Sequence, residues 1–402
     1  MTATANDVAE LDLLDPGFRV DSPEVRAAAV RHWYARTPLG PAVLRYEDCA
    51  AMLHDRRFRQ ASAEHLADQG ITDGPVADMW RDMILNIEGD RHGRLRRLVS
   101  QAFTPMAVDE LRPRMRATVH DLVDTFTPQG ACEFMAAFAD RYPPHVMSDL
   151  LGIPEEEQDQ FREWGRTLAL TISYSVAENL AAIDAARIGL YAATDWLCAS
   201  RRHRPGDDLV SRLVAAADNG DRLTTQELRS MVFGLVVGGQ DTTRNQLGLA
   251  LILFARHPEQ WALLAARPEL AARTTEEVMR LSPAVPIVWR TAAEDLVWRD
   301  LSIAAGTRLW LLVGAAHRDQ AAFGPDADRF DITAERPAAQ LAFGHGVHYC
   351  LGAALARAEI AEALPILAAR LPDLALAGEP TLRQELSGVV GPESLPIRFT
   401  VQ

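Results

Sequence analysis

The residue with the most distinctive chemistry is Cys350, near the end of the glycine-punctuated stretch FGHGVHYCLG (343–352). Residues 352–364 follow as an Ala/Leu-rich run, which predicts a helix. Cys350 would then lie at a helix N-terminus, where unpaired N–H groups and the helix dipole favour negative charge, so we expect a lowered thiol pKa. Gly344 and Gly346 permit backbone angles that other residues avoid. An anionic sulfur in such a loop suits an axial ligand of haem iron.

Two simpler readings compete with a haem ligand at this position. An isolated buried cysteine usually acts as a small hydrophobic side chain. His345, His348 and Cys350 could also be three zinc ligands, but a structural zinc site needs a fourth, and no second Cys/His pair stands nearby. The pattern Phe-Gly-x-Gly-x-His-x-Cys-x-Gly resembles the haem-binding loop of the bacterial cytochrome P450 monooxygenases. This resemblance implies that Cys350 binds the iron and that Phe343, Gly344 and His348 help to form the haem pocket.

A second group of residues could hold an anion. His92 and Arg96 are four residues apart in a stretch that predicts a helix (90–99), so they share one face. A solvated basic face is the alternative, and it is common for arginine-rich helices. The resemblance implies that His92 and Arg96 bind one haem propionate and that Arg290, after the extended segment Ser282–Pro286, binds the other. Arg94 and Arg97 could belong to a positive docking surface for an acidic electron donor.

A long buried helix with an unusual centre is expected between residues 224 and 257. Thr224 and Glu227 have the spacing of a capping box at its start, and Pro258 ends it. Its middle contains Gly238-Gly239-Gln-Asp241-Thr242, where two glycines cost about 2 kcal/mol of helix propensity relative to alanine. A kinked structural helix, with the threonine bonded back to a preceding carbonyl, would explain this pattern.

The same five residues also resemble the oxygen-activating groove of the cytochrome P450 family. The resemblance implies that the helix opens by one hydrogen bond at Gly238 and Gly239, which line the haem. It further implies that Asp241 relays protons from solvent and that Thr242 donates a hydrogen bond during dioxygen activation. These two residues are the predicted catalytic pair.

Structural and substrate-contacting positions are also expected from the resemblance. Glu277 and Arg280 lie three apart on a predicted helix and face each other. In the family this pair is buried and joined by an arginine from a later loop, for which Arg329 is the best match. Gly234 leaves space one helical turn before Gly238. The pocket above the haem is expected to be apolar and roomy, with these substrate-contacting residues: Ile84, Leu85, Gly234, Val237, Ile287, Val288 and Val389.

Composition limits the remaining classes of function. The chain has 402 residues, 48% of them hydrophobic and 24% charged, as in a large globular protein. A net charge of −14 argues against nucleic acid as the main partner. The four cysteines are far apart, so no disulfide framework or zinc ribbon is indicated. Neither a signal peptide nor an apolar run of about 18 residues is visible, which predicts a cytoplasmic protein without a membrane contact.

The chain is predicted to be mainly α with small β-sheets. Helical periodicity runs from residue 105 to 217, whereas short strands are expected near 40–46, 297–313 and 386–401. The last of these resembles the family's closing hairpin, with its tip near Val389. The resemblance covers the chain from about residue 40 to the end and implies the cytochrome P450 fold as a single domain, 1–402. In it, β segments at about 15–60 and 295–402 would pack on a helical haem-binding core.

The predicted activity is insertion of one oxygen atom of dioxygen into a hydrophobic small molecule, by hydroxylation or epoxidation, in secondary metabolism. The resemblance implies haem b and electrons from NAD(P)H through a ferredoxin reductase and a ferredoxin, with the enzyme as a monomer. A peroxide-driven enzyme would lack the acid–alcohol pair Asp241-Thr242. Oxidative aryl or C–C coupling would retain every motif. A non-catalytic haem- or ligand-binding helical protein would not explain Cys350, His92, Arg96 and Arg290 together.

Overall fold

A computed structural model describes residues 8–60, 64–100, 103–218, 223–383 and 388–401. Residues 386–387 of the expected closing hairpin lie outside these ranges. The α-helices are α1 (Pro23–Arg31), α2 (Tyr46–His54), α3 (Pro75–Asp82), α4 (Gly89–Ser100), α5 (Pro105–Asp109), α6 (Arg112–Asp124), α7 (Tyr142–Leu151), α8 (Gln158–Leu168), α9 (Val176–His203), α10 (Leu209–Asp218), α11 (Thr225–Ala255), α12 (Pro258–Ala266), α13 (Ala271–Leu281), α14 (Val313–Ala316), α15 (Gln320–Phe323) and α16 (Ala353–Arg370).

Shorter elements connect these helices. The 3-10 helices are η2 (Ala67–Gln69), η3 (Ile84–Asn86), η5 (Thr127–Gln129), η7 (Glu155–Glu157), η8 (Ala169–Ile172), η9 (Pro268–Leu270) and η10 (Gly346–His348), and η6 (Met135–Ala139) is a π-helix. The strands are β1 (Tyr34–Ala35), β2 (Ala42–Val43), β3 (Phe58–Gln60), β4 (Ala131–Glu133), β5 (Val288–Ala292), β6 (Leu296–Trp298), β7 (Leu301–Ile303), β8 (Arg308–Leu311), β9 (Ala375–Leu376), β10 (Thr381–Leu382), β11 (Pro392–Ser394) and β12 (Pro396–Arg398).

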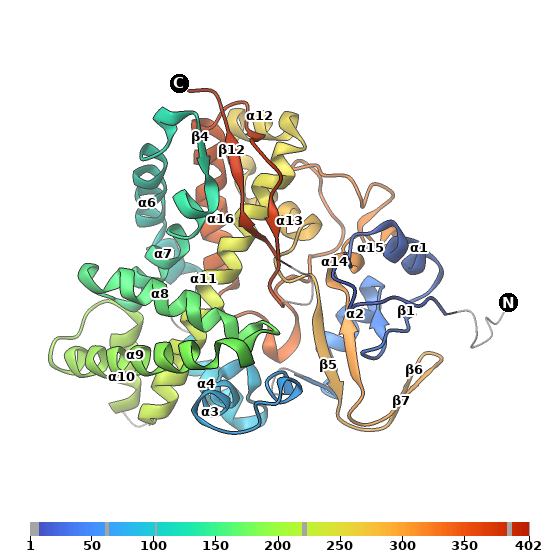
Figure 1. Ribbon diagram of the computed structural model, residues 1–402, viewed down its shortest axis with the longest axis horizontal. Helices are drawn as coiled ribbons and strands as arrows, with labels where there is room; N and C mark the ends of the chain where they lie inside the picture. Colours follow the sequence, from blue (N-terminus) through green and yellow to red (C-terminus); the bar gives the residue numbers. More distant parts are fainter. Residues whose placement is uncertain (1–7, 61–63, 101–102, 219–222, 384–387, 402) are drawn as a thin grey trace.

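Helix α11 is the central element of the core (Figure 1). It begins with the expected capping box, in which Thr224 Oγ1 accepts from the Glu227 N–H at 3.1 Å while a Glu227 carboxylate oxygen accepts from the Thr224 N–H at 3.1 Å. Its 31 residues correspond to about 46 Å at 1.5 Å per residue. A helix this long, with apolar residues on nearly every side, is stable only when other elements surround it.

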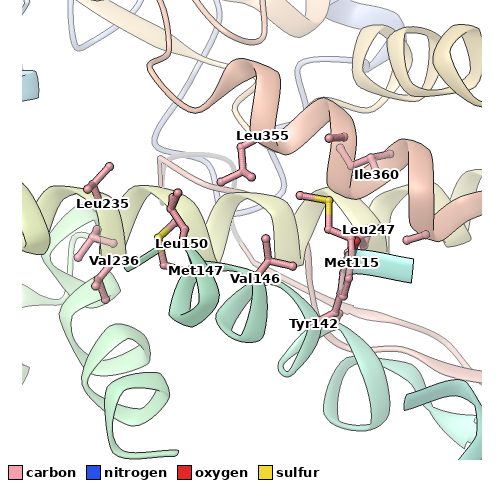
Figure 2. Close-up of a cluster of buried hydrophobic side chains, with 14 of the residues drawn as sticks. Met115, Tyr142, Val146, Met147, Leu150, Leu235, Val236, Leu247, Leu355 and Ile360 are labelled. Carbon is pink, nitrogen blue, oxygen red and sulfur yellow. The ribbon is translucent and has the colours of Figure 1, made fainter. Parts of the chain in front are cut away.

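Two helices enclose the middle of α11. Figure 2 shows Val146 and Met147 of α7 against one side of it, and Leu355 and Ile360 of α16 against the other. These side chains belong to one continuous apolar core and are almost entirely buried. Each such side chain contributes roughly 1.5–3 kcal/mol on burial. The two helices therefore hold the glycine-rich centre of α11 at a defined position against α16, which directly follows Cys350.

A five-stranded sheet brings together parts of the chain that are far apart in sequence. The strand order is β1-β2-β8-β5-β3, so the strands from residues 34–60 join those from 288–311. Figure 1 shows this β-rich region beside the helical part of the molecule. Gly306 turns the chain between β7 and β8 with φ of +81°, in the left-handed region that favours glycine. The sheet positions Arg290, which lies on β5 opposite Gln60 of β3.

Among the described residues, no helix is both long enough and apolar enough to cross a bilayer.

Candidate active site

An internal cavity of about 350 Å³ lies where α11, the start of α16, β5 and the 343–352 stretch meet. Nearly all the residues predicted to bind the cofactor or substrate line it. The exception is Val237; of the predicted catalytic pair, Thr242 lines the cavity and Asp241 does not. The prediction for Val237 was wrong: its side chain is fully buried in the core. It precedes Gly238 by one residue, about 100° around the helix, and that rotation turns it away from the cavity.

The loop before α16 presents Cys350 to this cavity. Its turn is closed by a hydrogen bond from the Cys350 N–H to the Phe343 carbonyl at 2.9 Å. Gly344 and Gly346 have φ of +66° and +69°, in the left-handed region. A Cβ on Gly346 would lie 2.6 Å from the Leu53 carbonyl oxygen, so this glycine is also required for the loop to pack on α2. Both glycines are therefore needed for the observed shape.

The thiol of Cys350 does not have the lowered pKa that its sequence context suggested. Burial raises the pKa, and a hydrogen bond from the Gly352 backbone together with the charges of Arg96 and Arg357 opposes this only in part. The helix N-terminus is present, since α16 begins at Ala353 with Gly352 as its N-cap, but desolvation outweighs it. A bound cation would supply the missing stabilisation, because a metal deprotonates the thiol that coordinates it.

Two arginines reach the cavity without a carboxylate partner. Arg290 is only 4% exposed, and its guanidinium donates to Gln60 Oε1 at 2.5 Å and to the Trp289 carbonyl at 3.0 Å. Burial lowers the pKa of Arg290 to about 10. Arg96 donates to the Tyr349 carbonyl at 2.5 Å. Among the described residues, neither arginine takes part in an ion pair, although buried charges are normally paired.

Histidines complete the same side of the cavity. His92 is buried, and its ring centroid lies 4.4 Å from that of His348. His348 Nε2 lies 3.1 Å from a Glu88 carboxylate oxygen. Burial, followed by the positive charges of His348 and Arg96, lowers the pKa of His92. His92 is therefore neutral near pH 7 and can donate one hydrogen bond without adding another positive charge.

The cavity fits haem by the chemistry of its lining. Cys350 would supply a sulfur ligand, and Arg96 and Arg290, which have no ion-pair partner among the described residues, would with His92 supply donors for two carboxylates. Gly352 and Gly238 leave flat backbone faces, since a Cβ at either position would meet no heavy atom within 4 Å. A planar cofactor with two carboxylates would thus satisfy the groups that the protein alone leaves unsatisfied.

The centre of α11 is helical throughout, without the expected opening by one hydrogen bond. Thr242 Oγ1 donates to the Gly238 carbonyl at 2.7 Å. This is the bond to a preceding carbonyl that is expected if the Gly-rich centre is a purely structural feature of the helix. A Cβ on Gly239 would lie 2.1 Å from Met147 Cε, so the tip of this methionine would have to move to admit a larger residue. Asp241 is 8% exposed and pairs with Arg383 through both oxygens, at 2.8 and 3.0 Å. The sequence did not reveal Arg383, which lies 142 positions away.

The buried pair Glu277–Arg280 is joined by Arg336, so the expectation for Arg329 was wrong. Glu277 accepts from Arg280 at 2.8 Å and from Arg336 at 2.7 Å. The side chain of Arg329 is 69% exposed, and only its backbone carbonyl joins the cluster, accepting from Arg280 and Arg336. No spacing rule identifies Arg336 in advance, because the chain between α15 and the cysteine loop is irregular.

The fold and the site together define a haem-thiolate protein, a helical protein in which a cysteine faces a cavity made for an anionic porphyrin. Residues 260–368 match the family model for cytochrome P450. The chain is 41% identical to luteothin monooxygenase of Streptomyces thioluteus over 98% of this chain and 96% of that protein. It is 39% identical to mycinamicin IV hydroxylase/epoxidase of Micromonospora griseorubida, over 88% of each.

Solved structures of similar proteins share the fold of this chain over nearly its whole length. The crystal structure of CalO2 superposes with a TM-score of 0.87 at 30% identity, covering 96% of this chain and 99% of that one. P450BioI, solved with an acyl carrier protein bearing a fatty acid, gives 0.85 at 31% identity, with 96% and 99% covered. The chain belongs to the cytochrome P450 family. It is a monooxygenase that uses haem b, dioxygen and electrons from NAD(P)H delivered through redox partners to oxidise a hydrophobic small molecule.

Proposed function

We propose that the substrate is an uncharged, apolar metabolite of polyketide type, oxidised by hydroxylation or epoxidation. One observation carries this proposal. Apart from Arg96, Arg290 and the histidines near Cys350, the described residues that line the cavity carry no side chain that is charged at neutral pH. Burial raises the pKa of Glu359, on α16, to about 8. Met83, Met231, Leu235 and Trp289 line the remainder. A relative from Bacillus subtilis, 35% identical over 89% of this chain and named as a cytochrome P450 of polyketide biosynthesis, supports a polyketide in particular.

The chain's own residues divide the work of the reaction. When bound, the haem activates dioxygen and supplies the oxidising oxygen atom. Cys350 would bind the haem iron through its sulfur, while Arg96, Arg290 and His92 would hold the propionates. Ile84 and Leu85 on η3, Gly234 on α11, and Ile287, Val288 and Val389 would shape the space for substrate. These apolar groups would also exclude water from the reacting centre.

Asp241 and Thr242 would move protons between solvent and the cavity. Thr242 Oγ1 already holds its proton on the Gly238 carbonyl, so it must rotate about its Cα–Cβ bond to direct that proton into the cavity. Asp241 reaches the surface side of α11 through its ion pair with Arg383, whose side chain is 27% exposed. The acid would therefore collect protons from water and the alcohol would donate them, as a general acid pair does.

We further propose a ferredoxin as the immediate electron donor and a cytoplasmic, monomeric enzyme folded as one domain. Arg97 and Arg94 lie on α4 beside the residues that would hold the propionates, and an acidic iron–sulfur protein would be attracted to such cations. Arg94 is engaged by Glu227. Arg97 is therefore the better candidate for the docking contact, and its exchange for glutamate should slow electron transfer at low salt.

Spectral titration of the ferric haem protein tests the substrate class. Neutral polyketides should displace the axial water and shift the haem absorption band, whereas acidic analogues of the same length should bind at least about tenfold more weakly. Equal affinity for the charged analogues would reject the proposal. Mass spectrometry of turnover products then separates oxygen insertion, which adds one oxygen atom, from oxidative coupling, which removes two hydrogens.

Thr242→Ala tests the proton-moving residues without emptying the pocket. The variant should bind substrate and consume electrons, but form less product per electron pair, by about 10-fold or more, because general acid catalysis contributes about 10²–10⁴-fold. Thr171→Ala is a suitable control, since Thr171 makes the same type of bond, to the Leu168 carbonyl, on η8. Unchanged product yield in Thr242→Ala would remove Thr242 from the pathway.

A further inference from the structure

The ion pair between Asp241 and Arg383 connects α11 to a segment that borders the substrate cavity. Arg383 follows β10, and its backbone N–H donates to the Gly391 carbonyl at 3.0 Å. Its guanidinium binds both oxygens of Asp241. Gly388 and Val389, five and six positions after Arg383, line the cavity, whereas Asp241 does not. One side chain thus links the expected proton carrier to residues that contact the ligand space.

A second contact joins the same two elements. A Cβ on Gly391 would lie 2.5 Å from the Asn245 side chain, so residue 391 packs directly on α11. Asn245 in turn donates to the Asp241 carbonyl at 2.7 Å. Segment 388–391 and the turn of α11 that carries Asp241 are therefore held together at both the side chain and the backbone of this aspartate.

Of the two arginines close to Asp241, one pairs with its carboxylate and the other is engaged elsewhere. Arg383 is the cation bonded to the Asp241 carboxylate among the described residues. Arg244, also on α11, is engaged by Asp140 and donates to Asn245 Oδ1 and to the Pro392 carbonyl. Both oxygens of Asp241 accept from the same nitrogen, Nη1 of Arg383, and these charge-assisted bonds favour one orientation of the carboxylate. Asp241 is not among the residues that line the cavity, so this orientation keeps the carboxylate out of it.

We propose that Arg383 is a positioning residue for Asp241, holding the carboxylate out of the cavity and tying its orientation to the segment that carries Val389. The proposal deepens the proposed function, because it assumes that Asp241 is the residue that carries protons. A ligand in contact with Val389 would then change the orientation of the Asp241 carboxylate by displacing segment 388–391 and, through it, Arg383. Proton delivery would respond to occupancy of the cavity without any contact between ligand and acid.

Hydrogen exchange of the haem-loaded enzyme tests the mechanical link without measuring activity. Asp241→Asn and Arg383→Gln should each raise amide exchange in segment 388–391 at least about threefold, since loss of a tertiary tie lowers the local opening free energy. The double variant should exceed neither single variant, because both remove the same interaction. Exchange that stays at the wild-type rate in Asp241→Asn, or that adds up in the double variant, would overturn the proposal.

A matched control is available on the same helix. Arg229 of α11 binds Asp195 through two hydrogen bonds, the longer at 2.9 Å, with a similarly exposed arginine side chain. Asp195→Asn removes this ion pair far from segment 388–391, so exchange there should not change. If Asp195→Asn raised exchange as much as Asp241→Asn, the effect would come from general loosening of α11, and the proposal would fall.

Product yield per electron pair provides a second, separate readout. Arg383→Gln should lower the yield about threefold or more with ligand affinity unchanged, Arg383→Lys should restore it, and neither should act further in an Asp241→Asn background. If Asp241→Asn leaves the yield at the wild-type value while exchange rises, the proton-carrying role in the proposed function is wrong but the positioning contact stands. An equal loss from Arg383→Gln in the Asp241→Asn background would reject the positioning role.

Discussion

Two groups of buried arginines in this protein are satisfied to very different degrees. Arg280 is 1% exposed and donates to Glu277 and to the carbonyls of His317, Ala327 and Arg329, so its charge and its N–H groups are met by the protein. Arg290 is nearly as buried, at 4%, but within the described part of the chain its side chain donates only to the Gln60 amide oxygen and the Trp289 carbonyl. The two sites have the same residue type and similar burial.

The difference separates a structural ion cluster from a ligand site. In a buried ion pair, the attraction between the two charges offsets the cost of burying them. Removing one member leaves an unpaired buried charge, which strongly destabilises the fold. A buried cation without an anionic partner costs stability until something anionic arrives. The Glu277 cluster thus holds α13 against the chain before Phe343, whereas Arg290 and Arg96 retain unmet positive charge, for which we propose the haem propionates as partners.

The largest expected effect comes from breaking the paired cluster. Glu277→Gln leaves Arg280 and Arg336 without their shared counter-charge, so the free energy of unfolding should fall by about 3–5 kcal/mol. Glu276→Gln is the control: its partner Arg357 and the carboxylate itself are about a third or more exposed, and such pairs contribute about 0–1 kcal/mol. Chemical denaturation of both variants measures the contrast. Equal losses would mean that burial does not distinguish the two pairs.

Removing the unpaired arginine should act in opposite directions with and without cofactor. Arg290→Leu should leave the haem-free protein as stable as before or more so, because a desolvated charge has gone. Haem should be held more weakly by about 10–100-fold, the equivalent of about 1.5–3 kcal/mol for hydrogen bonds to a charged group. Thermal unfolding measures the stability of the haem-free protein, and the rate of haem transfer to apomyoglobin measures how tightly haem is held. Arg59→Leu, at an exposed neighbouring position on β3, should change neither.

The paired cluster should also respond to acid. Burial alone would raise the pKa of Glu277, but hydrogen bonds from Arg280 and Arg336 outweigh it and leave the pKa below its ordinary value. A depressed carboxyl pKa contributes stability that is present above the ordinary carboxyl range, near pH 4.3, and is lost as pH falls through the folded value. The stability gap between wild type and Glu277→Gln should therefore shrink below about pH 4.3. A gap that is constant with pH would contradict this assignment.

The smallest effect on stability is expected at Arg329, the arginine that the family resemblance had predicted as the partner of Glu277. Arg329→Ala removes a side chain that is 69% exposed and lies 4.0 Å from the Asp331 carboxylate, so stability should change by no more than about 0.5 kcal/mol. Arg336→Ala is the matched variant and should cost several times more, because Glu277 then loses a buried partner. Similar losses for both variants would place Arg329 back in the cluster.

The sequence by itself determined the features that depend on local spacing. The capping box at Thr224, the glycines that shape the cysteine loop, and the shared helix face of His92 and Arg96 each involve residues within a few positions of one another. Turn geometry and helical periodicity act over that range, so residue type and spacing were sufficient. The cavity around Cys350, with nearly every predicted cofactor and substrate residue at its wall, followed from these features together with the family resemblance.

Tertiary structure alone decided the partners of buried charges and the state of the thiol. Arg336 rather than Arg329 reaches Glu277, Arg383 reaches Asp241 from 142 positions away, and burial raises the pKa of Cys350. Each outcome depends on which segments the folded chain places in contact and on how much water they exclude. Neither quantity is a function of local spacing, because long-range packing sets both the distance between charges and the dielectric between them.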